Sequence, residues 1–166
     1  MKTAYFAGGC FWCINMTFAS LSGVLKVTAG YSGGDEINPT YEDVKAQKTS
    51  HRETIKIEYD ETKISYSTLL DVFILNTDPF DSEGQFIDKG RSYTLAVYYN
   101  SIDELETAKS KIDKLEKESN KKVFISLERF KSFFEAEEYH QDFYLKHKEE
   151  FKKEMEESGR NNKKKE

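Results

Sequence analysis

The spacing of apolar residues along this chain switches repeatedly between two periods. Some runs alternate apolar and polar residues, which is typical of a half-buried strand, whereas others repeat apolar residues every three or four positions, as an amphipathic helix does. Clusters of Gly, Pro and Asp separate several of these runs and indicate turns. The order of the runs predicts strand, helix, strand, loop, strand, helix, strand, helix and strand, followed by one more helical segment.

Strands are expected at residues 3–8, 24–31, 51–60, 92–100 and 122–128, and helices at 11–21, 40–47, 65–75, 101–115 and 135–151. This alternation indicates an α/β fold of the α+β kind, a two-layer α/β sandwich with a ferredoxin-like mixed sheet and packed helices. Right-handed crossovers make the first two strands parallel, and likewise the third and fourth. If the two pairs run in opposite directions, one rim of the sheet carries Cys10, Tyr31, Glu53 and Tyr93.

Length, charge and hydropathy narrow the class of protein. The chain has 166 residues and a net charge of −5, so we expect one domain over 1–155, a disordered polar tail over 156–166, and no nucleic-acid partner. No apolar run approaches the ~20 residues of a membrane span, and "MKTAYFAGG" is too short for a secretory signal. We therefore expect a cytoplasmic protein with no membrane partner.

Both cysteines of the chain lie in the segment "GGCFWC", at residues 8–13. In a reducing compartment, two close cysteines favour catalysis or metal binding over a structural disulfide. Cys10 would open a helix, where unpaired N–H groups and the helix dipole lower a thiol's pKa and make it a nucleophile. The alternative is a small buried hydrophobic residue. Gly8 and Gly9 would permit a close approach to the backbone or a positive φ.

Glu53 falls in phase with the apolar residues of its strand and should face the core. Burial would raise its pKa and make it a proton donor near neutral pH, although an ion pair with Arg52 or a lysine is the common alternative. Tyr31 and Tyr93 would then be placed to donate hydrogen bonds to a developing oxyanion, or would simply be core residues.

A metal site is not expected. His51 and His140 accompany the two cysteines, but a single Cys-x-x-Cys is a weak zinc signal. Two other functions remain open from the residues alone. One is a thioredoxin-like thiol–disulfide oxidoreductase, and the other is a zinc-stabilised interaction domain.

Several motifs together resemble the peptide methionine sulfoxide reductase A family. The motifs are "GGCFW", "GYSGG", "NPTYEDV", "HRETIKIEYD", "DPFDSEGQFIDKGRSY" and "AEEYHQDFY". The resemblance implies a single catalytic domain on an α/β sandwich that reduces the S epimer of methionine sulfoxide, free or in oxidised proteins. It also implies that no metal or organic cofactor is bound.

The resemblance also implies roles for individual residues. Cys10 would attack the sulfoxide sulfur, and Glu53 would protonate the sulfoxide oxygen. Tyr31 and Tyr93 would hydrogen-bond that oxygen, while Asp88 would orient the site. These roles agree with the predicted rim, because a sulfoxide needs protonation of its oxygen before a thiolate can attack its sulfur.

The remaining implied roles concern the substrate's methyl group and the recycling of the enzyme. Phe11 and Trp12 would form the wall of the methyl pocket, although core packing is the alternative for Phe11. Attack would leave a sulfenic acid on Cys10, which an external thiol (thioredoxin, glutaredoxin or a dithiol) would reduce. Cys13 is a possible resolving cysteine; otherwise it only packs. The sequence departs from the family at Thr94, where many members have arginine.

Overall fold

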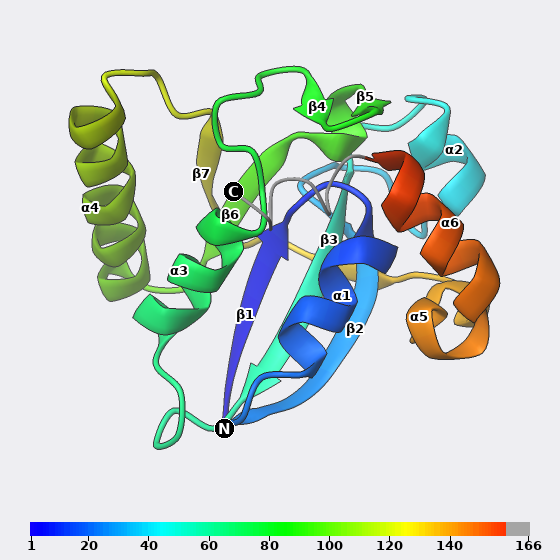
Figure 1. Cartoon of the computed structure of the whole chain (residues 1–166), viewed down its shortest axis with the longest axis horizontal. Coiled ribbons are helices and arrows are strands. Elements are labelled where there is room, and N and C mark those ends of the chain that lie inside the picture. Colours follow the sequence, from blue (N-terminus) through cyan, green and yellow to red (C-terminus); the bar gives the residue numbers. More distant parts are fainter. Residues whose placement is uncertain (159–166) are drawn as a thin grey trace.

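The computed structural model of the chain describes residues 1–158, and its centre is a six-stranded sheet (Figure 1). The strands are β1 (Lys2–Ala7), β2 (Val24–Ser32), β3 (Arg52–Tyr59), β6 (Leu95–Tyr99), β7 (Ile125–Arg129) and β8 (Phe133–Glu135), and a separate hairpin pairs β4 (Gly84–Gln85) with β5 (Asp88–Lys89). The helices are α1 (Phe11–Ala19), α2 (Tyr41–Lys45), α3 (Tyr66–Leu75), α4 (Ile102–Ser119), α5 (Phe143–Lys146) and α6 (Lys148–Ser158), with short 3₁₀ turns η1 (Arg91–Tyr93) and η2 (Glu138–His140).

The strand order β7-β6-β1-β3-β2-β8 confirms the predicted mixed sheet. Strands β1 and β2 are both antiparallel to β3, and β1 is also antiparallel to β6. It follows that β1 runs parallel to β2 and β3 runs parallel to β6, as the crossover rule predicts. The segment β1–α1–β2–β3–α3–β6 has the β-α-β-β-α-β connectivity of the ferredoxin-like fold.

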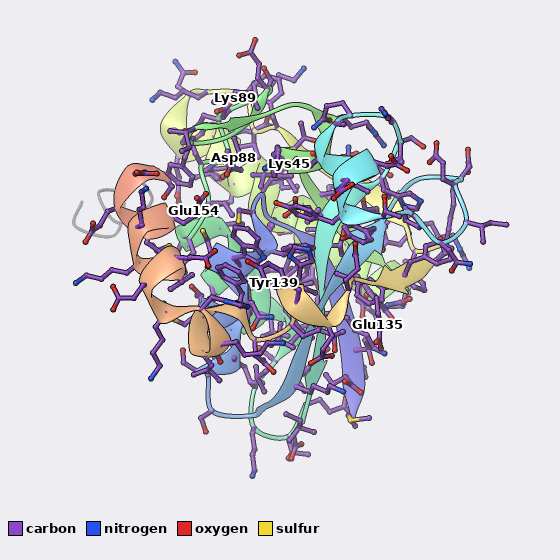
Figure 2. The ribbon with its side chains drawn as sticks, turned by 90° about the vertical axis from the view of Figure 1, so that its right-hand side faces the viewer. Lys45, Asp88, Lys89, Glu135, Tyr139 and Glu154 are labelled. Carbon is purple, nitrogen blue, oxygen red and sulfur yellow. The ribbon has the colours of Figure 1, made fainter. Side chains whose placement is uncertain are left out.

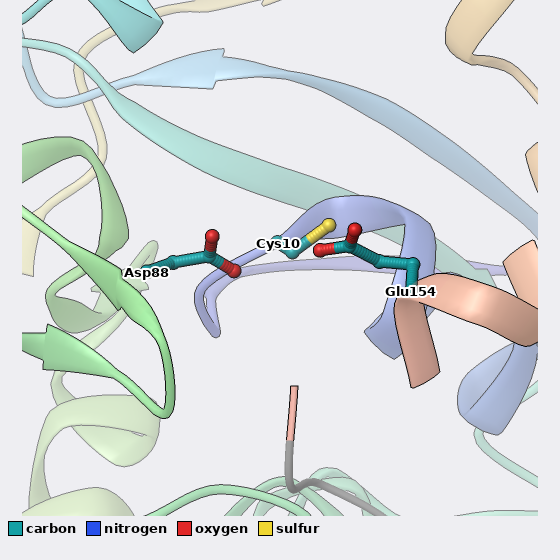
Figure 3. Close-up of side chains that lie close together, drawn as sticks. All are labelled: Cys10, Asp88 and Glu154. Carbon is teal, nitrogen blue, oxygen red and sulfur yellow. The ribbon is translucent and has the colours of Figure 1, made fainter. Parts of the chain in front are cut away.

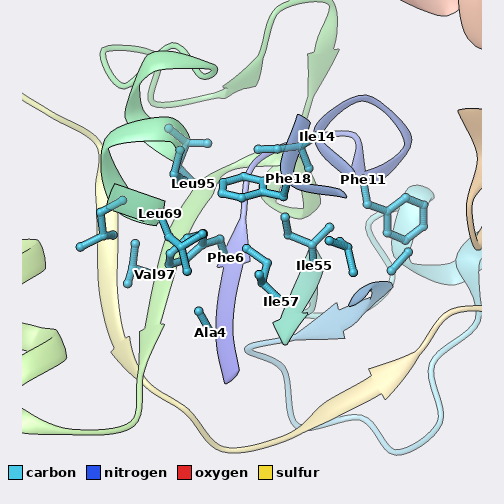
Figure 4. Packing of buried hydrophobic residues seen from close by; sticks show 14 of the residues in the cluster. Ala4, Phe6, Phe11, Ile14, Phe18, Ile55, Ile57, Leu69, Leu95 and Val97 are labelled. Carbon is cyan, nitrogen blue, oxygen red and sulfur yellow. The ribbon is translucent and has the colours of Figure 1, made fainter. Parts of the chain in front are cut away.

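The main core lies between the sheet and helices α1 and α3 (Figure 4). Phe6 of β1 is at its centre, with its ring centroid 5.0 Å from that of Phe73 on α3 and 5.9 Å from that of Phe18 on α1. All three rings are fully buried. This packing fixes α1 on the sheet, and it therefore fixes the position of the residue that begins α1.

Two local predictions are wrong for identifiable reasons. The alternation of apolar residues over 24–31 predicts that Leu25 shares one face of the strand with Val27, Ala29 and Tyr31. Those three are buried, but Leu25 is 59% exposed because the β2–β3 register shifts between Val24 and Lys26. The helix expected over 135–151 is instead broken into β8, η2, α5 and α6. The break occurs where the side chain of Gln141 bonds to both the N–H and the C=O of Ala29, and Asp142 adopts a left-handed φ of 50°.

The chain's last described helix extends past the predicted domain boundary. Helix α6 continues to Ser158, so the polar tail predicted from residue 156 begins too early. Residues 159–166 of that predicted tail lie outside the described residues. None of the helices within 1–158 is both long enough and apolar enough to cross a membrane.

Candidate active site

Cys10 lies between β1 and α1, at the N-cap of the helix. The turn needs glycine at Gly9, whose φ is 85°. The carbonyl of Cys10 accepts the N–H groups of Cys13 and Ile14, which begins the helix. The Cys10 side chain is only 6% exposed. The thiol therefore lies at one rim of the sheet and is largely shielded from bulk water.

The pKa of the Cys10 thiol is raised, which corrects the expectation that the helix start would lower it. A hydrogen bond with the Cys13 side chain and burial are the main causes, and the acidic groups of Glu53 and Asp88 add to them. These effects all disfavour a negative charge on sulfur. The thiol is consequently neutral at rest, and it must lose its proton during any reaction.

Glu53, at the start of β3, is a buried carboxylic acid. It is 1% exposed; its Oε1 accepts the N–H of Phe11 at 3.1 Å, and its Oε2 has no hydrogen-bond partner among the described residues. Burial raises the pKa of Glu53 to about 8. The ion pair considered from the sequence is absent within 1–158, because Arg52 points to the other face of the sheet and pairs with Glu128 at 2.6 Å. The predicted raised pKa is confirmed.

The two predicted tyrosines differ in their surroundings. Tyr93, in η1, is 7% exposed, and its pKa is raised by burial and by the nearby Glu53. Tyr31 is the cross-strand neighbour of Glu53, but its hydroxyl donates to Oε1 of Glu137 at 2.8 Å. Because that hydrogen bond occupies the hydroxyl, the geometry does not support Tyr31 as a donor to substrate.

Tyr41, which the sequence reasoning missed, also lies beside Glu53 and Cys10. It begins α2, directly after Thr40 caps the helix by accepting the N–H of Asp43. Its pKa is raised by burial and by the nearby acidic groups of Glu53 and Cys10. The signal for this residue was present in the motif "NPTYEDV", where the tyrosine follows a helix cap and so has a fixed direction.

Trp12 lies in an aromatic cluster beside the thiol. Its indole stacks on Phe143 with centroids 3.9 Å apart, and on Tyr41 at 6.0 Å. The indole N–H donates to Nδ1 of His140 at 3.0 Å, and burial lowers the pKa of His140, so its imidazole stays neutral and can accept. Phe11 is 1% exposed and belongs to the main core. Of the two residues expected to form the wall of the methyl pocket, Phe11 is therefore a core residue, and Trp12 is the one that stays a candidate for contact with substrate.

The histidines do not join the cysteines in a metal set. Nδ1 of His51 accepts the N–H of Gly34, and its Nε2 lies 2.8 Å from the carbonyl oxygen of Glu36. A different trio comes together within 1–158: a ligand atom each from Cys10, Asp88 and Glu154, all within 4.8 Å of one another (Figure 3).

Asp88 comes from the β4–β5 hairpin and Glu154 from α6. Figure 2 shows these two residues on the same side of the molecule, with Lys45 nearby. Asp88 and Glu154 are half-buried. The structure therefore brings together four of the five predicted reactive residues, namely Cys10, Glu53, Tyr93 and Asp88, and it adds Tyr41 and Glu154.

A buried thiol beside a neutral carboxylic acid, one buried phenol and one half-buried phenol characterises a thiol-dependent oxidoreductase that removes oxygen from its substrate. A model of the family described as "Peptide methionine sulfoxide reductase" matches residues 2–166. The peptide methionine sulfoxide reductase MsrA of Leuconostoc mesenteroides is 45% identical over 148 residues, which is 88% of this chain and 86% of that protein. That of Ligilactobacillus salivarius is 42% identical over 151 residues, covering 90% and 88%. The chain belongs to the peptide methionine sulfoxide reductase A family of oxidoreductases.

Solved structures agree with this assignment. The reduced form of Mxr1 from Saccharomyces cerevisiae superposes with a TM-score of 0.83 and 26% identity, covering 89% of this chain and 86% of that one. Methionine sulfoxide reductase A of Corynebacterium diphtheriae has the same fold, with a TM-score of 0.79, 24% identity, and coverage of 89% and 75%. These findings favour the reductase family over the thioredoxin-like alternative.

Proposed function

We propose that this enzyme reduces the S epimer of methionine sulfoxide, free or in oxidised proteins, with Cys10 as the nucleophile and Glu53 as the acid. The observation that carries the proposal is the buried Glu53 carboxyl, whose pKa of about 8 keeps it protonated at neutral pH. A sulfoxide sulfur becomes electrophilic when its oxygen is protonated or strongly hydrogen-bonded. A neutral acid beside a thiol is the pair that this reduction requires.

In the proposed reaction, Glu53 gives its proton to the sulfoxide oxygen while the sulfur of Cys10 attacks the sulfoxide sulfur. The oxygen ends on Cys10 as a sulfenic acid, so the sulfoxide is reduced to methionine by two electrons and the thiol is oxidised by two electrons. The thiol must also lose a proton. We assign that proton to the carboxylate of Asp88, which has an oxygen within 4.8 Å of the Cys10 sulfur. No metal or bound organic cofactor takes part.

Tyr41 and Tyr93 would hold the sulfoxide oxygen, and Trp12 would contact the substrate's methyl group. Support for the tyrosines comes from their position next to the acidic groups of Glu53 and Cys10, where Tyr93 is buried and Tyr41 is half-buried. The hydrogen bond that a hydroxyl donates to the sulfoxide oxygen becomes stronger as charge develops on that oxygen, so its contribution is largest in the transition state. The flat face of Trp12 is fixed by Phe143 and His140.

Exchanging the two candidate tyrosines for phenylalanine separates their roles. We expect Tyr41→Phe to lower kcat/KM about 10- to 100-fold, because it removes a donor to the reacting oxygen. Tyr31→Phe should lower kcat/KM by about threefold at most, since its hydroxyl bonds to Glu137. Steady-state assays on both purified variants measure the difference, with thermal unfolding as the control for folding. An equal or larger loss in Tyr31→Phe would contradict this assignment.

The reductant that restores Cys10 is proposed to be an external thiol such as thioredoxin, glutaredoxin or a dithiol. The yeast protein Mxr1 has been solved in complex with Trx2, at 19% identity to this chain and a TM-score of 0.59. This complex supports a thioredoxin-type partner. We place the enzyme in the cytoplasm, the reducing compartment in which two close cysteines favour catalysis over a structural disulfide.

Cys13 is proposed as the residue that first reacts with the sulfenic acid. The hydrogen bond between the two cysteine side chains brings their sulfur atoms together. After one equivalent of methionine sulfoxide without reductant, we expect mass spectrometry to find a Cys10–Cys13 disulfide, seen as the loss of two hydrogens. A stable gain of one oxygen, with Cys13 still open to alkylation, would assign direct reduction by external thiol instead.

An assay with a dithiol and racemic methionine sulfoxide tests the proposed function itself. Chromatography that separates the epimers should show the S epimer converted to methionine and the R epimer unchanged. Loss of both epimers, or of neither, would refute the proposal. Metal analysis of the purified protein tests the remaining zinc-domain alternative, which requires stoichiometric zinc.

A further inference from the structure

Helix α6 lies against the site and covers its thiol. It contacts α1 and α5, and Figure 1 shows it beside the start of α1, across from the β4–β5 hairpin. Phe151, Met155 and Ser158 are its buried residues, spaced four and three apart, so they form one inward stripe. With α6 in this position, the Cys10 side chain is almost wholly enclosed. The covering element therefore contributes side chains to the site itself.

One of those side chains is a methionine, the product of the proposed reaction. Met155 is 5% exposed and belongs to a small buried cluster with Cys10, Cys13, Phe143 and Phe151. This cluster is separate from the main core between the sheet and helices α1 and α3. The thioether of Met155 thus lies in the apolar surroundings of the two thiols.

Glu154, the residue before Met155 in α6, shows how close this helix comes to Cys10. A carboxylate oxygen of Glu154 lies within 4.8 Å of the Cys10 sulfur (Figure 3). Met155 follows it in the same helix, and its side chain is unbranched and flexible. Cys10 and Met155 therefore belong to one small buried cluster, and the flexible side chain comes from the helix that covers the thiol.

We propose that Met155 is an internal substrate: once its thioether has been oxidised to the sulfoxide, Cys10 of the same chain reduces it. Peroxide supplies the oxygen in the first step, in which the thioether gains one oxygen and the peroxide becomes water. In the second step the Cys10 thiol takes that oxygen as a sulfenic acid and the thioether is restored. This inference rests on the proposed function and goes beyond it, because it assigns a substrate within the enzyme's own chain.

The surroundings of Met155 favour this outcome over simple expulsion of the oxidised side chain. A sulfoxide is polar, and burying it among Phe143 and Phe151 without a hydrogen-bond donor is costly. The nearest donors proposed for a sulfoxide oxygen are those beside Cys10, namely Glu53, Tyr41 and Tyr93. Tethering also keeps the reacting groups together, so the reaction should not depend on collisions between chains.

The test compares Met155 with Met1 in the full chain. Met1 is 78% exposed and stands before β1, at the opposite end of that strand from Cys10. Both cysteines are first blocked as mixed disulfides with a small thiol. The chain is then oxidised with peroxide in urea, so that every methionine is accessible, and it is refolded. A dithiol restores the thiols and starts the reaction, and mass spectrometry of peptides follows each sulfoxide.

We expect the S epimer of the Met155 sulfoxide to disappear with a rate constant that is unchanged over an about tenfold dilution of the enzyme. The rate constant for Met1 should fall about tenfold, because Met1 reacts only between chains. An oxidised, isotopically labelled Cys10→Ser chain mixed with the active enzyme provides the matched control. Its Met155 sulfoxide should be reduced only at the slow, concentration-dependent rate.

The inference and the proposed function fail in different ways. A Met155 rate constant that falls with dilution like that of Met1, or a Met155 sulfoxide that persists, would overturn the internal substrate. Reduction of free methionine sulfoxide in the same refolded sample shows that the enzyme is active. If the free S epimer were also untouched, the proposed function itself would be refuted.

Discussion

Cys10→Ser is expected to abolish methionine sulfoxide reduction, lowering kcat by roughly 10⁴-fold or more. A serine hydroxyl is a far weaker nucleophile than a thiol, and oxygen has no counterpart of the sulfenic acid that must accept the substrate's oxygen. The change is small in volume at a position that is 6% exposed, so the fold should be kept. Loss of the S epimer, measured by chromatography with excess dithiol, reports the activity.

The matched control for this change is Cys13→Ser, three residues along the same helix. It should complete a first turnover, because Cys10 and Glu53 are intact, and it should leave a Cys10 sulfenic acid that a small dithiol can still reduce. Single-turnover formation of methionine in the absence of reductant distinguishes the two variants. If Cys10→Ser retained a substantial rate while Cys13→Ser lost it, the assignment of the nucleophile would be reversed.

Glu53→Gln is expected to have the next largest effect, a loss of about 10²- to 10⁴-fold in kcat/KM. Glutamine keeps the shape and can still donate a hydrogen bond, but it cannot transfer a proton to the sulfoxide oxygen. The wild-type enzyme should also lose activity as the pH rises through about 8, since the pKa of Glu53 is about 8 and its neutral form is the active one. That alkaline fall should be missing from the residual activity of Glu53→Gln.

Stability should respond to the same carboxyl group with a definite sign. In the unfolded chain Glu53 has an ordinary pKa, so it ionises near pH 4, whereas in the folded chain it holds its proton to about pH 8. The folded state thus binds the extra proton across this window, and its stability falls as the pH rises through it. Glutamine does not titrate. Urea unfolding should therefore show that the free energy of unfolding of Glu53→Gln rises, relative to that of the wild type, from pH 4 to 8. A constant difference would mean that Glu53 is ionised in the folded enzyme.

The parts of this site that the sequence predicts are those set by local rules. The period of two in β3 places Glu53 on the buried face, and the crossover rule brings the end of β1 and the start of β3 to one rim. The raised pKa of Glu53 follows from that burial. The thiol behaves differently, because the helix start is a local effect whereas the hydrogen bond with Cys13 and the nearby carboxyl groups depend on tertiary structure.

The parts that the sequence does not predict depend on contacts between distant segments. Tyr31 lies on the predicted strand and faces the predicted side, but its hydroxyl donates a hydrogen bond to Glu137, more than a hundred residues away. The same carboxylate accepts the N–H of Tyr41 at 3.0 Å, so the two tyrosines are linked through one distant residue. Helical periodicity likewise cannot reveal that Gln141 bonds to β2, which breaks the last helix and leaves α6 to fold over Cys10.

The pleat of β3 separates the side chains of Arg52 and Glu53, whose contact would stabilise the ionised form of Glu53 and lower its pKa. Arg52 and Glu53 are adjacent in sequence and both buried, but one side chain enters each face of the sheet. On its own face the guanidinium is held by Glu128 and by the hydroxyl of Thr94. A shift of β3 by one residue would bring the cation to the thiol side and the acid to Glu128. The sheet thus separates the two side chains, and Glu53 keeps its raised pKa because the permanent positive charge of Arg52, one residue away, lies on the opposite face.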